Sequence, residues 1–161
     1  MAKPRKRDAG ALDAIGVLKA DHRKVRALLS ELEGTTPRAA AKRAKLLESI
    51  EQELKIHTRI EETIFYPAYR DAARKQAERR LYFEALEEHH VVDMVLPELK
   101  QTEPDSDEFS AKVKVLKELV EHHADEEESD MFPKARRLMN RDELMDLGEQ
   151  LALAKEVAAA A

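Results

Sequence analysis

The sequence predicts an all-α protein, an up-down antiparallel four-helix bundle with an additional short C-terminal helix. Ala, Leu, Glu, Lys and Arg dominate the 161 residues, whereas only four are Gly and six are Pro, a composition that favours helices over sheets. Apolar residues recur at spacings of three and four along four long segments, with short connections between them. Long helices joined by short connections pack as antiparallel neighbours, so these observations together predict the bundle.

Turn and capping residues set the expected bounds of the helices. Gly34 suits the position after the first helix, and Pro37, preceded by Thr36 as a cap, suits the start of the second. Asn140 and Glu143 resemble a capping box at the start of the last helix. The expected helices therefore span about 11–33, 37–72, 75–101, 107–138 and 141–158.

Three prolines fall inside these predicted helices. Pro67 cannot donate a hydrogen bond to the carbonyl of Thr63, so we expect a kink or a stop near it. The same reasoning predicts disturbances at Pro97 in the third helix and at Pro133 in the last turns of the fourth.

The domain organisation follows from these elements. Residues 1–10 are expected to form a disordered basic tail, 11–138 the four-helix bundle, and 139–161 a C-terminal helix. Apolar residues line one face of that last helix, which predicts either a cover for the bundle or a homodimer contact. The residues of this face are Leu144, Leu147, Leu151 and Ala154.

Composition excludes several classes of site and partner. The absence of Cys excludes disulfides and thiolate metal sites, and no apolar run approaches the ~20 residues needed to cross a bilayer. A formal net charge of −5 gives no support to nucleic-acid binding by the folded domain. The basic start lacks the apolar segment of a secretory signal, so a cytoplasmic location without membrane or nucleic-acid partners is expected.

Each of the four long helices carries one histidine on its otherwise apolar face. The second and fourth helices add a glutamate one turn further along the same face. Four imidazoles and two carboxylates are thereby predicted in the interior of the bundle: His22, His57, Glu61, His89, His123 and Glu127.

An internal repeat relates the two halves of the bundle. The segment "DHRKVRALLSELE" (21–33) aligns with "EHHVVDMVLPELK" (88–100) at an offset of 67, which pairs His22 with His89. The second and fourth helices align at an offset of 66, which pairs His57 with His123. Two similar helical hairpins therefore each supply two histidines and one glutamate to the centre.

A metal site explains these four histidines and two glutamates better than an ordinary hydrophobic core does. A single histidine on an apolar face is more often a hydrogen-bonded core residue than a ligand. Two ionised carboxylates in one interior, however, repel each other and lose hydration at a cost of several kcal/mol per ion. A dinuclear cation site accounts for all six residues, and imidazole and carboxylate ligands without sulfur suit iron or manganese, with zinc as an alternative.

The motifs "HTRIEE", "EHH" and "HHADEEE", with Phe-x-Pro or Phe-Pro after each carboxylate, resemble those of the hemerythrin-like HHE cation-binding domains. The resemblance covers roughly residues 11–138 and implies a four-helix bundle around an oxo- or hydroxo-bridged di-iron centre. Carried over residue by residue, it implies the ligands His22, His57, Glu61, His89, His123 and Glu127.

Two departures distinguish the sequence from the oxygen carriers of that family. Ala85 and Asp93 occupy the positions one turn before and after His89, where the carriers have a fifth histidine. The last carboxylate, Glu127, comes four residues after His123 rather than as an Asp five residues after it. These features resemble the bacterial HHE and eukaryotic iron-sensing branches, for which peroxide decomposition, iron handling and sensing of O2 or NO are implied.

The functional expectation is therefore a di-iron protein that binds or reacts with peroxide, O2 or NO, with a catalase-like activity as its enzymatic form. An iron sensor or store without turnover and a zinc-loaded structural bundle are the alternatives. Neighbours of the ligands with candidate supporting roles are Glu62, His90, His122 and Tyr82. Glu62, Glu126 and Glu128 are expected to be solvated charges, with a substitute ligand or an entry relay for iron as the functional alternative.

Overall fold

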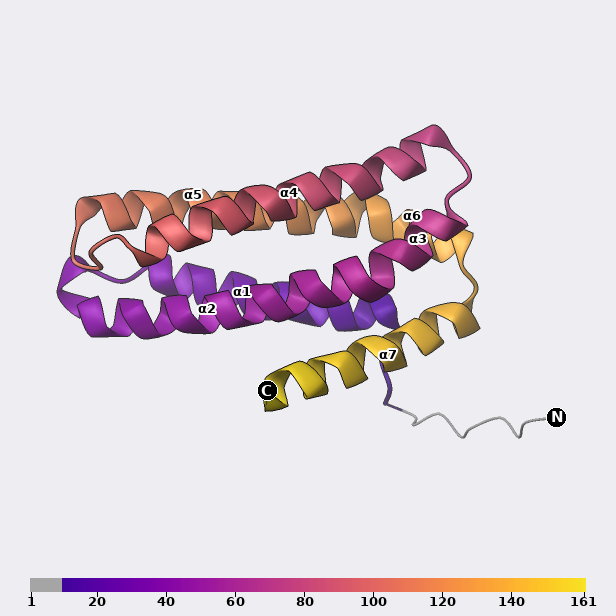
Figure 1. Ribbon diagram of the computed structural model, residues 1–161, viewed down its shortest axis with the longest axis horizontal. Helices are drawn as coiled ribbons and strands as arrows, with labels where there is room; N and C mark the ends of the chain where they lie inside the picture. Colours follow the sequence, from indigo (N-terminus) through magenta and orange to yellow (C-terminus); the bar gives the residue numbers. More distant parts are fainter. Residues whose placement is uncertain (1–9) are drawn as a thin grey trace.

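Four long helical segments form the bundle of the computed structural model, which describes residues 10–161 (Figure 1). Helices α1 (Ala14–Glu33) and α2 (Ala40–Ile60) form one hairpin, and α4 (Gln76–Lys100) and α5 (Asp107–Glu126) form the other. Contacts between α1 and α5 and between α2 and α4 join the two hairpins. The predicted fold class is confirmed, and most of the predicted basic tail lies outside the described residues.

Local signals define the helix ends largely as expected. The predicted capping box starts α7 (Arg141–Ala160), because the Glu143 amide donates to Asn140 Oδ1 at 3.0 Å and the Asn140 amide donates to Glu143 Oε2 at 2.7 Å. Gly34 ends α1 in a right-handed conformation. Pro37 opens a short 3₁₀ turn, η1 (Pro37–Ala39), in which Thr36 makes no side-chain capping bond.

The second and fourth helices are both interrupted by a π-helical turn that begins at a predicted glutamate ligand. These turns, η2 (Glu61–Phe65) and η3 (Glu127–Met131), continue into the short helices α3 (Tyr66–Ala72) and α6 (Phe132–Leu138). The Tyr66 amide bonds the Glu61 carbonyl, and the Phe132 amide bonds the Glu127 carbonyl, five residues back in each case. Pro67 and Pro133 are the second residues of the helices that follow these turns, so the expected disturbances occur next to them.

The π turns correct the predicted core beyond the glutamates. Each turn adds one residue to the helical repeat and rotates everything after it by about 100°. An uninterrupted helical period predicts Ile64, Ala68 and Asp130 on the buried face, but all three are only partly buried. The buried positions are instead Phe65, Tyr66, Tyr69, Met131 and Phe132.

The expected disturbance at Pro97 is wrong. Helix α4 continues through this residue to Lys100. Pro97 lies close to the end of the helix and removes one backbone hydrogen bond there. Leu96 and Leu99 on either side of it are buried in the core, and their packing outweighs that loss.

The buried histidines and glutamates separate two apolar clusters. One cluster contains Ile15, Phe65 and Phe132, and the other contains Leu54 and Val120. Among residues 10–161, no helix combines the length and apolar character needed to cross a bilayer. The interior therefore consists of two packed hydrocarbon regions with a polar layer between them.

Helix α7 packs against α1 and α2 beside the end of the bundle that carries the π turns (Figure 1). Leu144 and Leu151 of its predicted apolar face are buried, and Gly148 lies between them. A Cβ added at Gly148 would lie 2.7 Å from the Asp13 carbonyl carbon and 2.9 Å from the Ala14 amide nitrogen. The close approach of α7 to the start of α1 therefore requires glycine.

Gly148→Ala should destabilise the protein by about 1–3 kcal/mol, because the obstructing atoms belong to the backbone and α7 must move away from α1. The expected decrease in melting temperature is roughly 2–12 °C, measured by circular dichroism. Gly34→Ala is the matched control, since its Cβ would lie 3.4 Å from the nearest atom. Equal melting of the two variants would contradict the requirement for glycine.

Candidate metal centre

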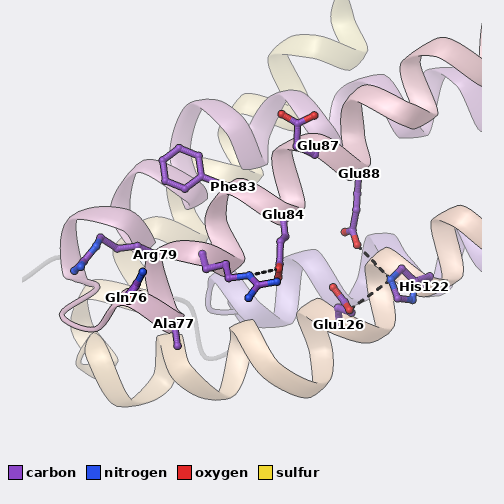
Figure 2. A pocket seen from close by; sticks show the side chains of 10 residues that line it. Gln76, Ala77, Arg79, Phe83, Glu84, Glu87, Glu88, His122 and Glu126 are labelled. Carbon is purple, nitrogen blue, oxygen red and sulfur yellow. Dashed lines mark hydrogen bonds and ion pairs between the residues drawn. The ribbon is translucent and has the colours of Figure 1, made fainter.

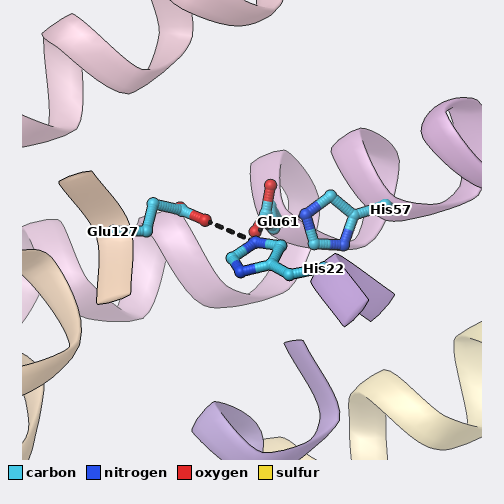
Figure 3. A group of neighbouring side chains, drawn as sticks. All are labelled: His22, His57, Glu61 and Glu127. Carbon is cyan, nitrogen blue, oxygen red and sulfur yellow. Dashed lines mark ion pairs between the residues drawn. The ribbon is translucent and has the colours of Figure 1, made fainter. Parts of the chain in front are cut away.

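The structure brings the six predicted residues together in the polar layer of the bundle, and Figure 3 shows four of them, His22, His57, Glu61 and Glu127. All six are at least 94% buried, and each long helical segment contributes at least one. They are His22 of α1, His57 and Glu61 of the second segment, His89 of α4, and His123 and Glu127 of the fourth segment.

Glu61 lies between two histidine pairs. Its Oε1 is 3.0 Å from His57 Nε2, whereas its Oε2 is 3.1 Å from His89 Nε2 and 3.9 Å from His123 Nε2. The two oxygens therefore face different imidazoles. This is the placement expected of a carboxylate shared by two cations.

Glu127 approaches the centre from the opposite segment. Its Oε2 is 3.1 Å from His22 Nε2, the ion pair drawn in Figure 3, and 3.5 Å from His123 Nε2. The Oε1 atom accepts a hydrogen bond of 2.8 Å from the Tyr66 hydroxyl. One oxygen thus faces the imidazoles and the other is held by a fixed donor.

Four buried atoms at the centre have neighbours at short distance but no hydrogen-bond geometry with them. They are His22 Nε2, His57 Nε2, Glu61 Oε1 and Glu127 Oε2. Burial without a partner costs free energy, and such atoms call for an unseen ligand. The residues fit a metal. The four residues that carry these atoms can each place one ligand atom within 4.8 Å of those of the others. A second group, Glu61, His89 and His123, can do the same.

A carboxylate accepts a hydrogen bond from the Nδ1 atom of every one of these histidines. Because an ionised carboxylate can only accept, Nδ1 carries a proton and Nε2 is the nitrogen directed to the centre, where it can bind a cation once any proton on it has been displaced. The pairs are His22 with Glu128 at 2.8 Å, His57 with Asp21 at 3.3 Å, His89 with Glu62 at 2.8 Å, and His123 with Glu88 at 2.6 Å.

These carboxylates follow the internal repeat. Asp21 and Glu88 are related by the offset of 67, and Glu62 and Glu128 by the offset of 66. Asp21 and Glu88 were missed by the sequence analysis, although each directly precedes a predicted ligand. Asp21 also pairs with Lys155, which links α7 to the centre through His57.

The other predicted neighbours lie further out. Glu62 contacts the centre through His89, as described above. His122 is exposed on α5 beside Glu88, and His90 is exposed on α4. Tyr82 packs edge-on against the Tyr66 ring at 6.2 Å.

Tyr66 is a functional candidate that the spacing of the sequence does not predict. Its buried hydroxyl donates to Glu127 and lies 3.2 Å from His89 Nε2 and 3.3 Å from Glu61 Oε2. The π turn rotates it inward, which ordinary helical spacing does not predict. The repeat offered a signal, because Tyr66 matches Phe132, and these rings stack on His89 and His22 respectively.

Burial and opposite charges oppose each other in setting the pKa values at the centre. Burial lowers the pKa of His57, but the charge of Glu61 and the bond to Asp21 outweigh it and raise that pKa to about 10. The pKa of His123 is likewise well above its usual value, through Glu127, Glu61 and Glu88 against the effect of burial. Burial and the nearby carboxylates raise the pKa of Tyr66.

Comparison with known proteins identifies the family of this chain. Residues 13–135 match the hemerythrin HHE cation-binding domain. The chain belongs to this family. The hemerythrin HHE domain thus spans α1 to α6, including all six residues of the centre.

Relatives agree with this assignment. One similar solved structure is the crystal structure of a hemerythrin HHE cation-binding domain-containing protein from Mycobacterium kansasii, a homologue of Rv2633c. It superposes on this chain with a TM-score of 0.81 and is 30% identical in sequence. The superposition covers 92% of this chain and 88% of the Mycobacterium kansasii chain. Rv2633c from Mycobacterium tuberculosis is 31% identical over 88% of this chain and 84% of its own. A DNA nickase from Nostoc is 27% identical over 86% of this chain, which spans only 38% of the nickase.

Proposed function

We propose that this HHE domain binds two iron ions at the six central residues and that the loaded centre binds or reacts with peroxide, O2 or NO. The observation that carries the proposal is the group of four buried nitrogen and oxygen atoms that lack a hydrogen-bond partner, together with the place of Glu61 in both groups of donors. Mixed imidazole and carboxylate donors suit iron, and the family resemblance favours iron over manganese or zinc. A bound iron pair would supply open coordination positions and electron exchange.

A small cavity next to the histidines supports a small ligand. Its volume is about 20 Å³, which holds a molecule about the size of water. The four imidazoles line it together with apolar side chains, including Leu54, Val92 and Val120. A space of this volume cannot hold a large substrate, which favours a diatomic molecule or peroxide.

Tyr66 would contribute a fixed hydrogen-bond donor. Because its pKa lies well above the usual value of 10, the hydroxyl remains protonated at neutral pH. It holds Glu127 Oε1 and leaves Oε2 directed toward the imidazoles. The carboxylates on Nδ1 keep the four Nε2 lone pairs aligned, so the chain presents a preorganised set of donors.

Metal analysis combined with spectroscopy and a peroxide assay tests the function. Iron-grown protein should contain about two iron ions per chain, absorb in the near ultraviolet, and release O2 from peroxide. His57→Ala should lose about half the iron and nearly all of the activity, whereas His90→Gln, an exposed neighbour of a ligand, should retain both. Full iron without O2 release would favour a sensor or store, and colourless zinc-loaded protein would favour a structural bundle.

Cation binding should release protons, because His57 with a pKa of about 10 is protonated in the cation-free chain at pH 7. The affinity should therefore rise with pH up to about 10, by roughly tenfold per pH unit for each proton displaced. Co2+ titrations with a pH indicator between pH 6.5 and 8.5 measure both quantities. Binding that releases no proton over this interval would contradict the protonated state of His57.

A further inference from the structure

A second group of cation-binding side chains lies on the surface between α4 and α5 (Figure 2). Glu88 of α4 faces His122 and Glu126 of α5, and the three residues can place one ligand atom each within 4.8 Å of one another. His122 is exposed, whereas Glu88 and Glu126 are partly buried. The group lies outside the six residues of the internal centre.

The distances in this group suit a shared cation. His122 Nε2 lies 3.4 Å from Glu126 Oε1 and 3.5 Å from Glu88 Oε1. A charge-assisted hydrogen bond from nitrogen to a carboxylate is typically shorter, about 2.7–2.9 Å. Two ligands of a tetrahedral Zn2+ ion at bond lengths of about 2.0–2.1 Å lie about 3.4 Å apart, which matches both separations.

No lysine or arginine of the described residues neutralises the charge of this group, and the other partner of Glu88 is His123, whose Nδ1 lies 2.6 Å from Glu88 Oε2. Within residues 10–161, neither Glu88 nor Glu126 forms an ion pair with a lysine or arginine. Arg80, which lines the same hollow, is paired with Glu84 at 2.7 Å. Two carboxylates close to one imidazole therefore leave a local negative charge that a divalent cation would offset.

The group is open to solvent through a broad hollow. This hollow has a volume of about 1160 Å³ and is lined by Glu84, Glu87 and Phe83 as well as by the three residues of the group. Figure 2 shows Glu88 directed from α4 toward His122 and Glu126. A hydrated cation can reach them without any movement of the helices.

This surface group is present in only one of the two hairpins that the internal repeat relates. At the offset of 66, the positions of His122 and Glu126 correspond to Ile56 and Ile60, which cannot bind a cation. The opposite hairpin therefore has no equivalent group. The two residues are an addition to one half of the bundle, with chemistry of their own.

We propose that Glu88, His122 and Glu126 bind a third divalent transition-metal cation at the surface. Glu88 joins this outer site to the internal centre, because its other oxygen accepts the hydrogen bond from His123 Nδ1. The outer site uses only its own three residues. It does not depend on whether the internal centre holds iron, zinc or manganese.

Equilibrium dialysis of the cation-free chain against Co2+, followed by metal analysis, tests the outer site. Wild-type protein should bind one more Co2+ per chain than His122→Gln or Glu126→Gln. His90→Gln is the matched control, because His90 is also exposed beside a central histidine but forms no ion pair with another described residue. It should bind as much Co2+ as wild type, and unchanged circular dichroism would verify the fold of each variant.

The double variant His57→Ala/Glu61→Gln separates this inference from the proposed function. It should lose Co2+ from the internal centre and retain the ion at the outer site. Adding His122→Gln to it should then remove one further Co2+ per chain. Equal stoichiometry and affinity in wild type and His122→Gln, or an equal loss in His90→Gln, would overturn the proposal.

Discussion

Glu61→Gln should reduce the bound metal to one ion per chain or fewer at the internal centre. Glu61 directs Oε1 toward His57 and Oε2 toward His89, so it belongs to both groups of donors. Glutamine preserves the shape of the side chain but removes its negative charge and replaces one oxygen with a donor that cannot bind a cation. Both cation positions would therefore lose a ligand in a single substitution.

Activity should fall further than metal content. Loss of residues that merely support metal ligands typically costs 10–100-fold, so loss of a shared ligand should lower O2 release from peroxide by at least about 100-fold. Iron analysis and an oxygen electrode measure the two effects on the same preparation. Because Glu61 is completely buried, circular dichroism is needed to verify that the variant is folded.

Glu118→Gln provides the control for this substitution. Glu118 is an exposed carboxylate on α5 whose ion pair is with Lys114, away from the centre. It should leave metal content and activity unchanged. A folded Glu61→Gln variant that retains two iron ions at the internal centre would refute the assignment of Glu61 as a shared ligand.

Removal of metal should lower the melting temperature by about 8–16 °C for each cation lost. A cation at 1,000 times its dissociation constant stabilises the folded state by about 4 kcal/mol, and a chain of this size gains about 2–4 °C per kcal/mol. Without cations, two carboxylates and four imidazoles remain in an interior flanked by hydrocarbon. Calorimetry of iron-loaded protein before and after chelation measures the difference.

The decrease in melting temperature on removal of metal should be larger at higher pH. In the cation-free chain, the raised pKa of His57 stabilises the fold fully below pH 6.5, and this contribution is lost as the pH rises through about 10. In the loaded chain, His57 has no such proton to lose. The gap between the two melting temperatures should therefore be wider at pH 8.5 than at pH 6.5.

Restoration by added metal controls for damage by the chelator. The original melting temperature should return with iron in wild type, but to a much smaller extent in Glu61→Gln. Identical melting of treated and untreated protein, with negligible metal in both, would refute a metal-stabilised interior.

The residues at the centre could be predicted because they obey the ordinary helical period. From α1 to Glu61, and again from α4 to Glu127, the chain has the spacing of three and four that marks one helix face. The repeat added a second constraint, which selected His89 and His123 rather than His90 and His122. All six residues lie in the buried polar layer.

The contacts beyond Glu61 and Glu127 could not be predicted from that period. The π turns shift the register, which places Tyr66 rather than Ile64 in the interior. The place of α7 was also open, and the close approach of Gly148 to the start of α1 determines it. Neither result follows from the helical pattern of the segment in which it occurs.

By itself, the sequence determined the helical bundle and the set of buried donors, since both follow from local periodicity and an internal repeat. Only the tertiary structure decided how these donors are held. The bonds from His57 to Asp21 and from His123 to Glu88 join residues 36 and 35 positions apart in the chain. They depend on the packing of neighbouring helices, because the spacing within one helix does not specify which side chain of another helix it meets.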